Sequence, residues 1–257
     1  MKSLQGKWAL ITGSSRGIGQ QIALGLAQQQ CNLILHGRTP ESVRNTAALL
    51  EQYPVEIHAV AGDLGTDEGV ESVVRGVLDG PGYIDILYNN AAIMNAWQPV
   101  WEIPERVWRE VFQVNLFALV SLCSSFAPGM LERGFGRIVN LSSGIRDTPQ
   151  LAPYSVSKAA VDKYTRDLAA ELRGSNVLVN ALDPGWLRTD MGGPDADHEV
   201  TTVLPGALQP ALLEDDGPSG QCFALIPRPA PSAPWRRKRC PRAGPCAPCR
   251  CRCHRNQ

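Results

Sequence analysis

The sequence predicts an α/β fold built on a doubly wound parallel sheet, and three observations support this class. Short apolar runs rich in β-forming residues alternate with longer helical stretches from residue 7 to about residue 182. A glycine-rich turn directly follows the first of these runs. The chain has 257 residues, of which 44% are hydrophobic and 19% are charged, as in globular domains with a substantial core. This composition excludes disordered, collagen-like and coiled-coil chains.

Six short apolar strands are expected: Trp8 to Thr12, Leu33 to His36, Ile57 to Val60, Ile84 to Tyr88, Arg137 to Leu141, and Val177 to Leu182. Because helical sequence follows each of them, the strands should run parallel, with helices on both faces of the sheet. Ligands of such a sheet bind at the carboxyl ends of the strands, near the point where the strand order reverses.

Start signals locate the helices between these strands. The first helix is expected over Gln20 to Gln29, after the glycine-rich turn. Thr39-Pro40-Glu41 supplies an N-cap, a proline at the first helical position and an acid in the first turn. Ile103-Pro104-Glu105 opens another helix, continued by the apolar spacing of Val107, Val111, Val114 and Leu119. After the sixth strand, the pattern weakens into a helix candidate over Val200 to Leu213 and a last strand within Gly220 to Ile226.

The net charge of zero conceals an uneven distribution. Residues 227–257 contain nine of the 25 Lys and Arg residues, none of the 25 Asp and Glu residues, and seven of the 20 prolines. Prolines every few residues prevent regular structure, and the charge cannot be buried. We therefore expect one domain over residues 1–226, followed by a disordered basic tail over residues 227–257.

The tail also holds five of the eight cysteines, among them Cys246, Cys249, Cys251 and Cys253, which precede His254. Thiolates and imidazole bind zinc, but no apolar sequence separates two ligand pairs here, so we expect no metal site. Only Trp235 offers a stacking platform beside the basic charge, so we expect no nucleic-acid partner. The abrupt change in composition instead favours an altered reading frame or a non-native terminus.

Targeting and membrane signals are not expected in this sequence. No run approaches the roughly eighteen apolar residues that a membrane-spanning helix needs, and the first eight residues have no apolar stretch of signal-peptide length. Before the tail the cysteines are few and scattered, as in proteins of reducing compartments: Cys31, Cys123 and Cys222. We expect a cytoplasmic protein with no membrane partner.

The turn after the first strand reads Thr12-Gly13-Ser14-Ser15-Arg16-Gly17-Ile18-Gly19. A helix N-terminus presents unpaired N–H groups and a partial positive charge, and glycines let a pyrophosphate approach the backbone closely. A glycine-rich turn without a ligand is the plain alternative. The position between a first strand and a helix favours phosphate binding.

Five further segments follow in a fixed order: Asp63-Leu64, Asn89-Asn90-Ala91-Ala92, Ser142-Ser143, Tyr154-Ser155-Val156-Ser157-Lys158 and Pro184-Gly185. With the glycine-rich turn, they resemble the short-chain dehydrogenase/reductase family over about residues 5–225. Residues 182–194 resemble the carbonyl-reductase-like members most. The resemblance implies a Rossmann fold, a nicotinamide cofactor and reversible interconversion of a carbonyl and an alcohol.

Tyr154 and Lys158 are four residues apart on an expected helix, so their side chains share one face. A tyrosine with a pKa of about 10 exchanges protons poorly at neutral pH, but an adjacent ammonium favours its phenolate. We therefore expect Tyr154 to be the acid/base and Lys158 to lower its pKa. Alone, this spacing would indicate a solvated helix surface; the upstream cofactor loop and the small neighbours Ala159 and Ala160 favour the catalytic role.

The resemblance implies two more catalytic residues. Ser143 resembles the serine that hydrogen-bonds the substrate oxygen and steadies developing charge, with the neighbouring Ser142 as the open alternative. Asn115 matches the asparagine that holds a proton-relay water beside the lysine. Its apolar neighbours favour a buried position over a helix-surface one.

The end of the second strand bears on the choice between NAD and NADP. An acid there would accept hydrogen bonds from a ribose 2′-OH and would repel a 2′-phosphate. The sequence has His36-Gly37-Arg38 instead. Arg38 and Arg16 offer two guanidinium groups whose geometry suits a phosphate, although both could be ordinary surface arginines. The missing acid at position 37 favours NADP(H) over NAD(H).

The remaining cofactor contacts are implied by the resemblance. Asp63 should contact the adenine, Asn89 the cofactor ribose region and Thr189 the nicotinamide end. The other expected contacts, besides Tyr154 and Lys158, are Gly13, Ser15, Gly17, Ile18, Gly19, Leu64, Ala91, Pro184 and Gly185. The resemblance also implies a homodimer or homotetramer and a small carbonyl or alcohol substrate.

We therefore expect an NADP(H)-dependent oxidoreductase that interconverts a carbonyl and an alcohol by hydride transfer, with Tyr154 as the acid/base. The alternative is a nucleotide-binding protein with little or no turnover, because the C-terminal sequence departs from the family pattern.

Overall fold

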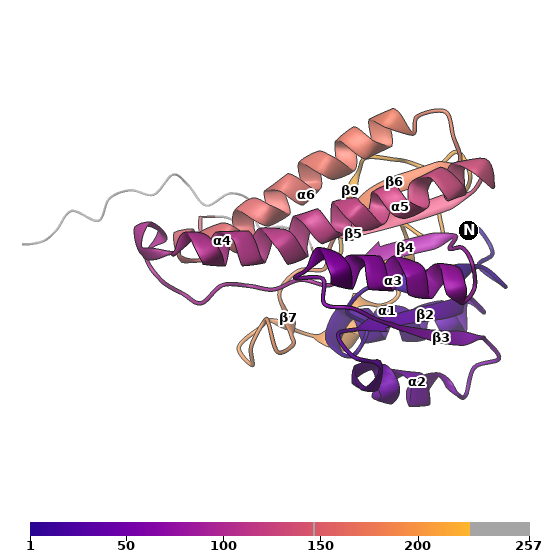
Figure 1. Cartoon of the computed structure of the whole chain (residues 1–257), viewed down its shortest axis with the longest axis horizontal. Helices are drawn as coiled ribbons and strands as arrows, with labels where there is room; N and C mark the ends of the chain where they lie inside the picture. Colours follow the sequence, from indigo (N-terminus) through magenta and orange to yellow (C-terminus); the bar gives the residue numbers. More distant parts are fainter. Residues whose placement is uncertain (146, 227–257) are drawn as a thin grey trace, which may run out of the picture. The chain divides into compact units, whose positions relative to one another are not determined.

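The computed structural model describes residues 1–145 and 147–226, and Figure 1 shows its ribbon. The expectations for the tail, which are disorder and the absence of a metal site, concern residues 227–257 and lie outside this described part.

A seven-stranded sheet forms the centre of the fold. Its strands are β1 (Trp8–Ile11), β2 (Asn32–Gly37), β3 (Ile57–Ala61), β4 (Ile86–Asn89), β5 (Gly136–Leu141), β6 (Val177–Asp183) and β9 (Cys222–Ala224). The order across the sheet is β3-β2-β1-β4-β5-β6-β9, and every neighbouring pair is parallel. The predicted doubly wound Rossmann-type sheet is thus confirmed, and its strand order reverses between β1 and β4.

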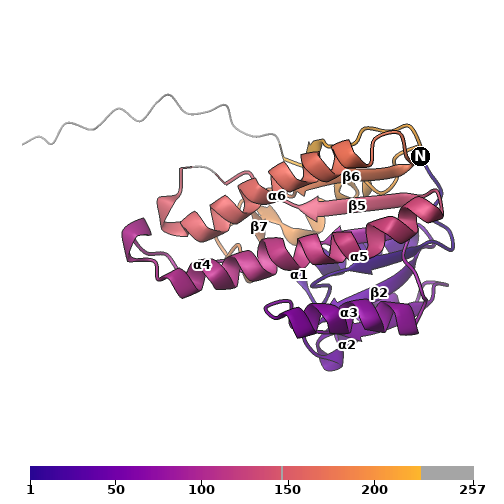
Figure 2. The same ribbon diagram turned by 45° about the horizontal axis from the view of Figure 1, so that its top comes forward.

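Six α-helices surround this sheet in the described residues: α1 (Gly17–Gln28), α2 (Arg44–Leu50), α3 (Asp67–Asp79), α4 (Glu105–Phe112), α5 (Ala118–Glu132) and α6 (Ala152–Glu171). Figures 1 and 2 show α3, α5 and α6 on one face of the sheet and α1 with α2 on the other. Between α4 and α5 lies one π-helical segment, η3 (Gln113–Phe117).

The alternation of side chains along the strands divides the interior into two cores. On β1, Ala9 and Ile11 pack with α1 on one face, while Leu10 packs with α3, α5 and α6 on the other. All three side chains are fully buried. A strand that buries both faces must be apolar at nearly every position, which explains the continuous apolar runs in the sequence.

The helix expected over Val200 to Leu213 is wrong. This segment forms two short 3-10 turns, η5 (Val200–Val203) and η6 (Gly206–Leu208), because Pro205 lies between them and cannot donate a backbone hydrogen bond. The segment still covers the first core, since Ala207 and Leu208 are buried in it. The Tyr88 hydroxyl donates a 2.9 Å hydrogen bond to the Ala207 carbonyl and ties η6 to β4.

The N-cap expected at Thr39 also differs from the structure. The Thr39 side chain makes no capping hydrogen bond, and the segment begins as a 3-10 turn, η1 (Pro40–Val43), before α2. The Ser42 hydroxyl donates a 2.6 Å hydrogen bond to the Thr39 carbonyl instead. The last strand is confirmed within its expected range, although β9 is shorter.

One continuous helix, Glu105–Glu132, is long and apolar enough to cross a membrane by length and composition, with a mean hydropathy of 1.6. This differs from the expectation that no stretch would pass such a test. Its apolar side chains Leu122, Phe126 and Met130 are buried in the second core against the sheet. A core helix satisfies the same test, so its length and composition do not identify a membrane span.

Candidate active site

The glycine-rich loop joins β1 to α1 in a backbone shape that favours glycine. Gly13 and Gly17 have φ values of +63° and +59°. A Cβ atom at Gly19 would lie 2.4 Å from the Gly13 carbonyl oxygen and 2.6 Å from Nδ2 of Asn90. Gly19 is therefore buried against Gly13, whereas Ser15, Gly17 and Ile18 between them are partly exposed where α1 begins. An open backbone at a helix N-terminus fits the pyrophosphate of a dinucleotide.

The carboxyl end of β4 supports this loop. The Asn90 side-chain amide donates to the carbonyls of Thr12 (2.8 Å) and Gly13 (3.1 Å). The Ala91 backbone N–H donates a 3.0 Å hydrogen bond to Oγ1 of Thr12. The expected contact residue Ala91 is therefore packed directly against the loop. These bonds fix the loop at the point where the strand order reverses.

Asn89 lies at the end of β4, and its expected contact with the cofactor ribose region stays a prediction. Its side chain is buried and donates to Oδ1 of Asn140 at 2.9 Å, on the core side of β4. Successive residues of a strand point to opposite sides, so Asn90, which the sequence analysis did not single out, is the residue whose amide reaches the glycine loop. The Asn89 Oδ1 has no hydrogen-bond partner in the described part of the chain.

The segment after β6 lies beside the same loop. A Cβ atom built on Gly17 would be 3.6 Å from Cγ2 of Thr189, and Nε of Arg16 lies 2.8 Å from Oδ2 of Asp190. The buried Pro184 and the exposed Gly185, which has a φ of +79°, turn the chain toward this position. The expected contact of Arg16 with a phosphate stays a prediction; in this structure Arg16 forms an exposed ion pair with Asp190.

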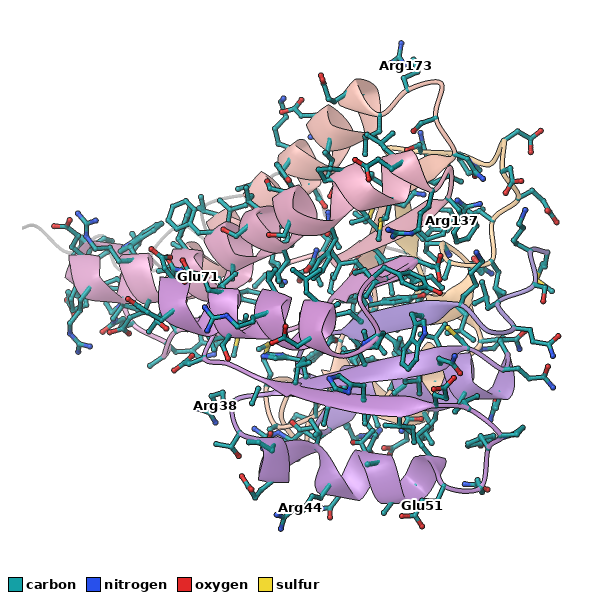
Figure 3. The ribbon with its side chains drawn as sticks, turned by 45° about the vertical axis from the view of Figure 1, so that its right-hand side comes forward. Arg38, Arg44, Glu51, Glu71, Arg137 and Arg173 are labelled. Carbon is teal, nitrogen blue, oxygen red and sulfur yellow. The ribbon has the colours of Figure 1, made fainter. Side chains whose placement is uncertain are left out.

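The end of β2 leaves no room for an acid at position 37. A Cβ atom there would lie 1.9 Å from Oγ of Ser42 and 3.1 Å from Cγ1 of Val43. Arg38 follows as an exposed residue, and Figure 3 shows its side chain pointing away from the sheet. Within residues 1–145 and 147–226, Arg38 forms no ion pair.

Asp63 and Leu64 follow β3 with different surroundings. Asp63 is exposed, and its Oδ1 accepts a 2.9 Å hydrogen bond from the Gly65 N–H. Leu64 is buried in the second core. The Asp63 side chain is thus open to a ligand at the carboxyl edge, whereas Leu64 contributes its backbone there.

Tyr154 and Lys158 lie one helical turn apart near the start of α6. Nζ of Lys158 is 5.8 Å from the centre of the Tyr154 ring and donates a 2.7 Å hydrogen bond to the carbonyl of Leu141, the last residue of β5. Lys158 is buried, whereas Tyr154 is half-buried. The sequence spacing therefore does bring the two side chains together at the carboxyl end of β5.

The pKa values of this pair are governed by burial. Burial lowers the pKa of Lys158 to about 8, while the Asp162 carboxylate acts in the opposite direction. Burial also raises the pKa of Tyr154, and the Asp183 carboxylate adds to this rise. A hydrogen bond with the Ser143 side chain lowers it in part. The expectation that Lys158 would bring the Tyr154 pKa down is therefore not met here, and the phenol is protonated at neutral pH.

The two serines after β5 have different partners. The Ser142 hydroxyl donates to Oδ1 of Asp162 at 2.5 Å, and Ser142 is buried. Ser143 is only half-buried; its Oγ accepts a 3.2 Å hydrogen bond from the Ile145 N–H and also bonds to Tyr154. Ser143 is therefore the serine that faces the tyrosine, because Asp162 holds Ser142.

Asn115 lies inside the π-helical segment and is buried. Its Oδ1 accepts a 2.8 Å hydrogen bond from the Ile93 N–H, and its Nδ2 donates to the Ile93 carbonyl (2.9 Å) and to Oγ of Ser157 (3.0 Å). The Asn115 side chain is thus buried, as expected. Asn115 links the segment after β4 to the turn of α6 that carries Lys158.

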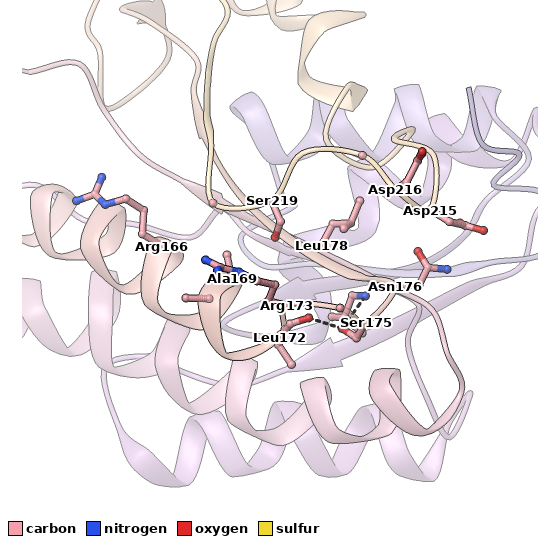
Figure 4. A pocket seen from close by; sticks show the side chains of 15 residues that line it. Arg166, Ala169, Leu172, Arg173, Ser175, Asn176, Leu178, Asp215, Asp216 and Ser219 are labelled. Atoms are coloured by element: carbon pink, nitrogen blue, oxygen red, sulfur yellow. Dashed lines mark hydrogen bonds between the residues drawn. The ribbon is translucent and has the colours of Figure 1, made fainter.

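A cavity of about 680 Å³ opens elsewhere on the molecule. Its lining includes Arg166, Arg173, Asn176 and Ser219, at the C-terminal end of α6 and the start of β6 (Figure 4). Arg166, the lining residue of α6 nearest to Tyr154, lies twelve residues further along the helix, which corresponds to about 18 Å along the axis. This cavity is therefore remote from the Tyr154 hydroxyl and is not the catalytic cleft.

Two interactions of the site could not be read from the sequence. Asp162 follows Lys158 by four residues, so its place on the same helix face was readable, but its bond to Ser142 depends on how α6 packs on β5. The Arg16–Asp190 pair joins two loops far apart in the chain. No sequence signal marks such a pair.

Comparisons with known proteins decide the family. A family model described as short chain dehydrogenase matches residues 7–200. Dehydrogenase/reductase SDR family member 4 of Bos taurus is 37% identical over 188 residues, which cover 72% of this chain and 67% of the relative. The chain belongs to the short-chain dehydrogenase/reductase family.

Solved structures agree with this family and its fold. A putative NAD(P) dependent gluconate 5-dehydrogenase from Beutenbergia cavernae, with bound NADP, is 32% identical with a TM-score of 0.78, covering 87% of this chain and 96% of that one. An NAD⁺-bound xylitol dehydrogenase is 25% identical with a TM-score of 0.77, covering 87% and 98%. As a short-chain dehydrogenase/reductase, this chain is an NAD(P)-dependent oxidoreductase that acts on CH–OH groups.

Proposed function

We propose that this short-chain dehydrogenase/reductase uses NADP(H) to interconvert a small carbonyl compound and its alcohol, with Tyr154 as the acid/base. The observation that carries the proposal is the arrangement of Tyr154, Ser143 and Lys158 at the carboxyl end of β5. The glycine-rich loop is at the same edge of the sheet, because β1 and β5 flank β4 in parallel. The nicotinamide cofactor supplies a hydride to the carbonyl carbon, or accepts one from the alcohol carbon.

The residues of this chain handle the proton at the substrate oxygen. In the reducing direction the Tyr154 hydroxyl, whose raised pKa keeps it protonated, donates its proton to the oxygen as negative charge develops there. The Ser143 hydroxyl donates a hydrogen bond to the same oxygen. The Lys158 ammonium, one turn along α6, stabilises the phenolate that remains.

The preference for NADP(H) rests on the end of β2. The Ser42 side chain fills the space that a side chain at Gly37 would need, so no acid is there to bind a ribose 2′-OH or to repel a 2′-phosphate. Arg38 is exposed and forms no ion pair in the described part of the chain. Bound NADP in the Beutenbergia cavernae structure supports this choice, while the NAD⁺-bound xylitol dehydrogenase shows that the fold accepts both cofactors.

The proposed partners are a small carbonyl or alcohol substrate and further copies of this chain. Phe117 and Val156 are 51% and 45% exposed, and they lie where the helix that begins at Glu105 crosses the start of α6. Apolar side chains on an exposed helix face favour association. We propose a homodimer or homotetramer located in the cytoplasm, and light scattering of the purified protein tests the assembly.

The deciding experiment compares wild type with Tyr154→Phe. NADPH oxidation is followed against a panel of ketones and aldehydes, and NADPH binding is followed by fluorescence. We expect kcat to fall at least about a hundredfold while the Kd for NADPH stays within about twofold, because the phenol supplies the proton and not the phosphate contacts. Tyr83→Phe is the matched control, since Tyr83 is an exposed tyrosine beside Arg133.

Two results would overturn this function. Undiminished activity of Tyr154→Phe would show that another group exchanges the proton. Tight NADPH binding by the wild type without turnover of any carbonyl would instead favour a nucleotide-binding protein.

A further inference from the structure

His36 is a buried histidine whose two ring nitrogens are both hydrogen-bonded. It lies near the carboxyl end of β2 and is 3% exposed. Its Nδ1 is 3.1 Å from the backbone nitrogen of Gly13, in the glycine-rich loop. Its Nε2 is 3.0 Å from the carbonyl oxygen of Gly62, directly after β3. The ring therefore bridges two loops that belong to neighbouring strands.

These partners allow one arrangement of the ring proton. The Gly13 N–H can only donate, so Nδ1 must be the unprotonated acceptor. The Gly62 carbonyl can only accept, so Nε2 must carry the proton. Burial lowers the pKa of His36, whereas the Gly62 carbonyl and the Asp63 carboxylate raise it. The neutral ring with its proton on Nε2 satisfies both neighbours.

The backbone of His36 adds to this connection. The His36 N–H donates to Oγ of Ser14 at 3.0 Å, and the Ser14 N–H donates to the His36 carbonyl at 3.0 Å. The Thr46 hydroxyl binds the other side of the loop through the Ser14 carbonyl at 2.8 Å. The first residues of the glycine-rich loop are thus held on β2, and the His36 side chain supplies the bond to Gly13.

We propose that His36 is a positioning residue that sets the cofactor affinity by holding Gly13 and Gly62 in place through its two ring nitrogens. The inference rests on the proposed function, in which the glycine-rich loop binds the cofactor phosphates and the segment after Gly62 contacts the adenine. The bond to Gly13 matters most for affinity, because Gly13 makes the bend of the loop, with a φ of +63°, and its carbonyl packs against Gly19 in the first turn of α1.

Two substitutions separate the two ring contacts. In His36→Asn the side-chain oxygen is placed like Nδ1 and can accept from Gly13, but the side chain is too short to reach Gly62. In His36→Gln the terminal amide is placed like Nε2 and can donate to Gly62, but no acceptor faces Gly13. Kd for NADPH, KM for the cofactor, kcat at saturating cofactor and the melting temperature are measured for both variants of the full chain.

We expect His36→Asn to bind NADPH within about twofold of wild type and His36→Gln to bind it about fivefold more weakly, since one internal hydrogen bond contributes about 1 kcal/mol. Saturating kcat should stay within about twofold for both, because the reacting atoms are untouched. His58→Asn is the matched control, since His58 lies on β3 and bonds to Gly76. Equal losses in both variants, or no loss in His36→Gln, would overturn the inference.

Two more measurements keep the result unambiguous. Nitrogen NMR of the imidazole in the wild-type protein should show His36 protonated at Nε2, and the opposite tautomer would overturn the inference even if a variant failed to fold. Gly19→Ala, which places a Cβ against Gly13, tests the loop itself. If it leaves NADPH binding intact, the proposed cofactor site is wrong; if it abolishes binding while both His36 variants bind normally, only the role of His36 is wrong.

Discussion

The Ser142 hydroxyl donates a 2.5 Å hydrogen bond to the Asp162 carboxylate on α6. This bond connects the end of β5 to α6 next to Lys158. The same carboxylate raises the pKa of Lys158, whereas burial lowers it. The bond also leaves Ser143, and not Ser142, next to Tyr154. The two adjacent serines thus have different partners: Ser142 bonds to Asp162 and Ser143 bonds to Tyr154.

The two serines should therefore give opposite results on mutation to alanine. Ser143→Ala should lower kcat/KM by about ten- to a hundredfold with little change in stability, because a hydrogen bond to the developing oxyanion is lost. Ser142→Ala should keep most activity but unfold at lower urea concentration, since the half-buried Asp162 carboxylate loses its donor. A larger loss of activity in Ser142→Ala would contradict this assignment.

Lys158 gives a prediction about stability and pH. Its pKa is about 8 in the folded protein, below its ordinary value of 10.5, so the unfolded chain holds more protons between these two pH values. The burial cost is fully present below pH 8 and disappears as the pH rises toward 10.5. Between pH 7.5 and 9.5, the free energy of unfolding of wild type should therefore rise relative to Lys158→Met by about 1 to 2 kcal/mol.

Urea denaturation of both proteins at the two pH values measures this difference. All other titrating groups are common to both chains and cancel. A difference that does not change with pH would mean that Lys158 titrates near its ordinary value.

Arg38 gives a prediction about cofactor preference. Arg38→Ala should weaken NADPH binding about tenfold or more and leave NADH binding unchanged, because a guanidinium–phosphate contact is lost only with NADPH. Arg44→Ala is a matched control, since Arg44 is an exposed arginine that pairs with Glu41. Fluorescence titration with both cofactors measures the effect. An intact NADPH preference in Arg38→Ala would make Arg38 an ordinary surface charge.

The Arg16–Asp190 ion pair gives a prediction about the proposed phosphate contact of Arg16. Asp190→Asn removes the carboxylate that lies 2.8 Å from Nε of Arg16, so this arginine becomes available to the 2′-phosphate. We expect NADPH to bind about two- to threefold more tightly, a small gain because exposed ion pairs are weak. The gain should vanish in the double variant with Arg16→Ala. Weaker NADPH binding in Asp190→Asn would show that the carboxylate supports the loop.

The fold was readable from the sequence because a parallel sheet covered on both faces needs apolar residues at nearly every strand position. The runs at Ala9 to Ile11 and Val177 to Leu182 have this pattern and form β1 and β6. Val200 to Leu213 was misread because its buried side chains also recur at helical spacing, while Pro205 prevents the helix. The spacing of apolar residues indicates which side chains are buried, but a proline can prevent the helix that this spacing suggests.

The site could be predicted from the sequence only where interacting residues are close together in the chain. Tyr154 and Lys158 are one helical turn apart, so the sequence already placed them together. The direction of the Tyr154 pKa was misjudged because burial is a property of the assembled fold, and here burial raises this pKa. Asn90 was passed over because the choice between two adjacent asparagines depends on the pleat of β4.

The π-helical segment at Gln113–Phe117 fixes the rotation between the parts of the helix that precede and follow it. A π turn holds one residue more than an α turn, so everything after it is rotated by about 100° relative to an uninterrupted helix. Within the turn, Asn115 binds Ser157 on α6; after it, Leu122 and Phe126 belong to the second core. Deleting one residue here would rotate the part of the helix before the segment relative to the part after it, so that both could not keep their present contacts. The number of residues in this segment is therefore constrained more strongly than their side chains. A Val114 deletion that folds and binds NADPH normally would refute this.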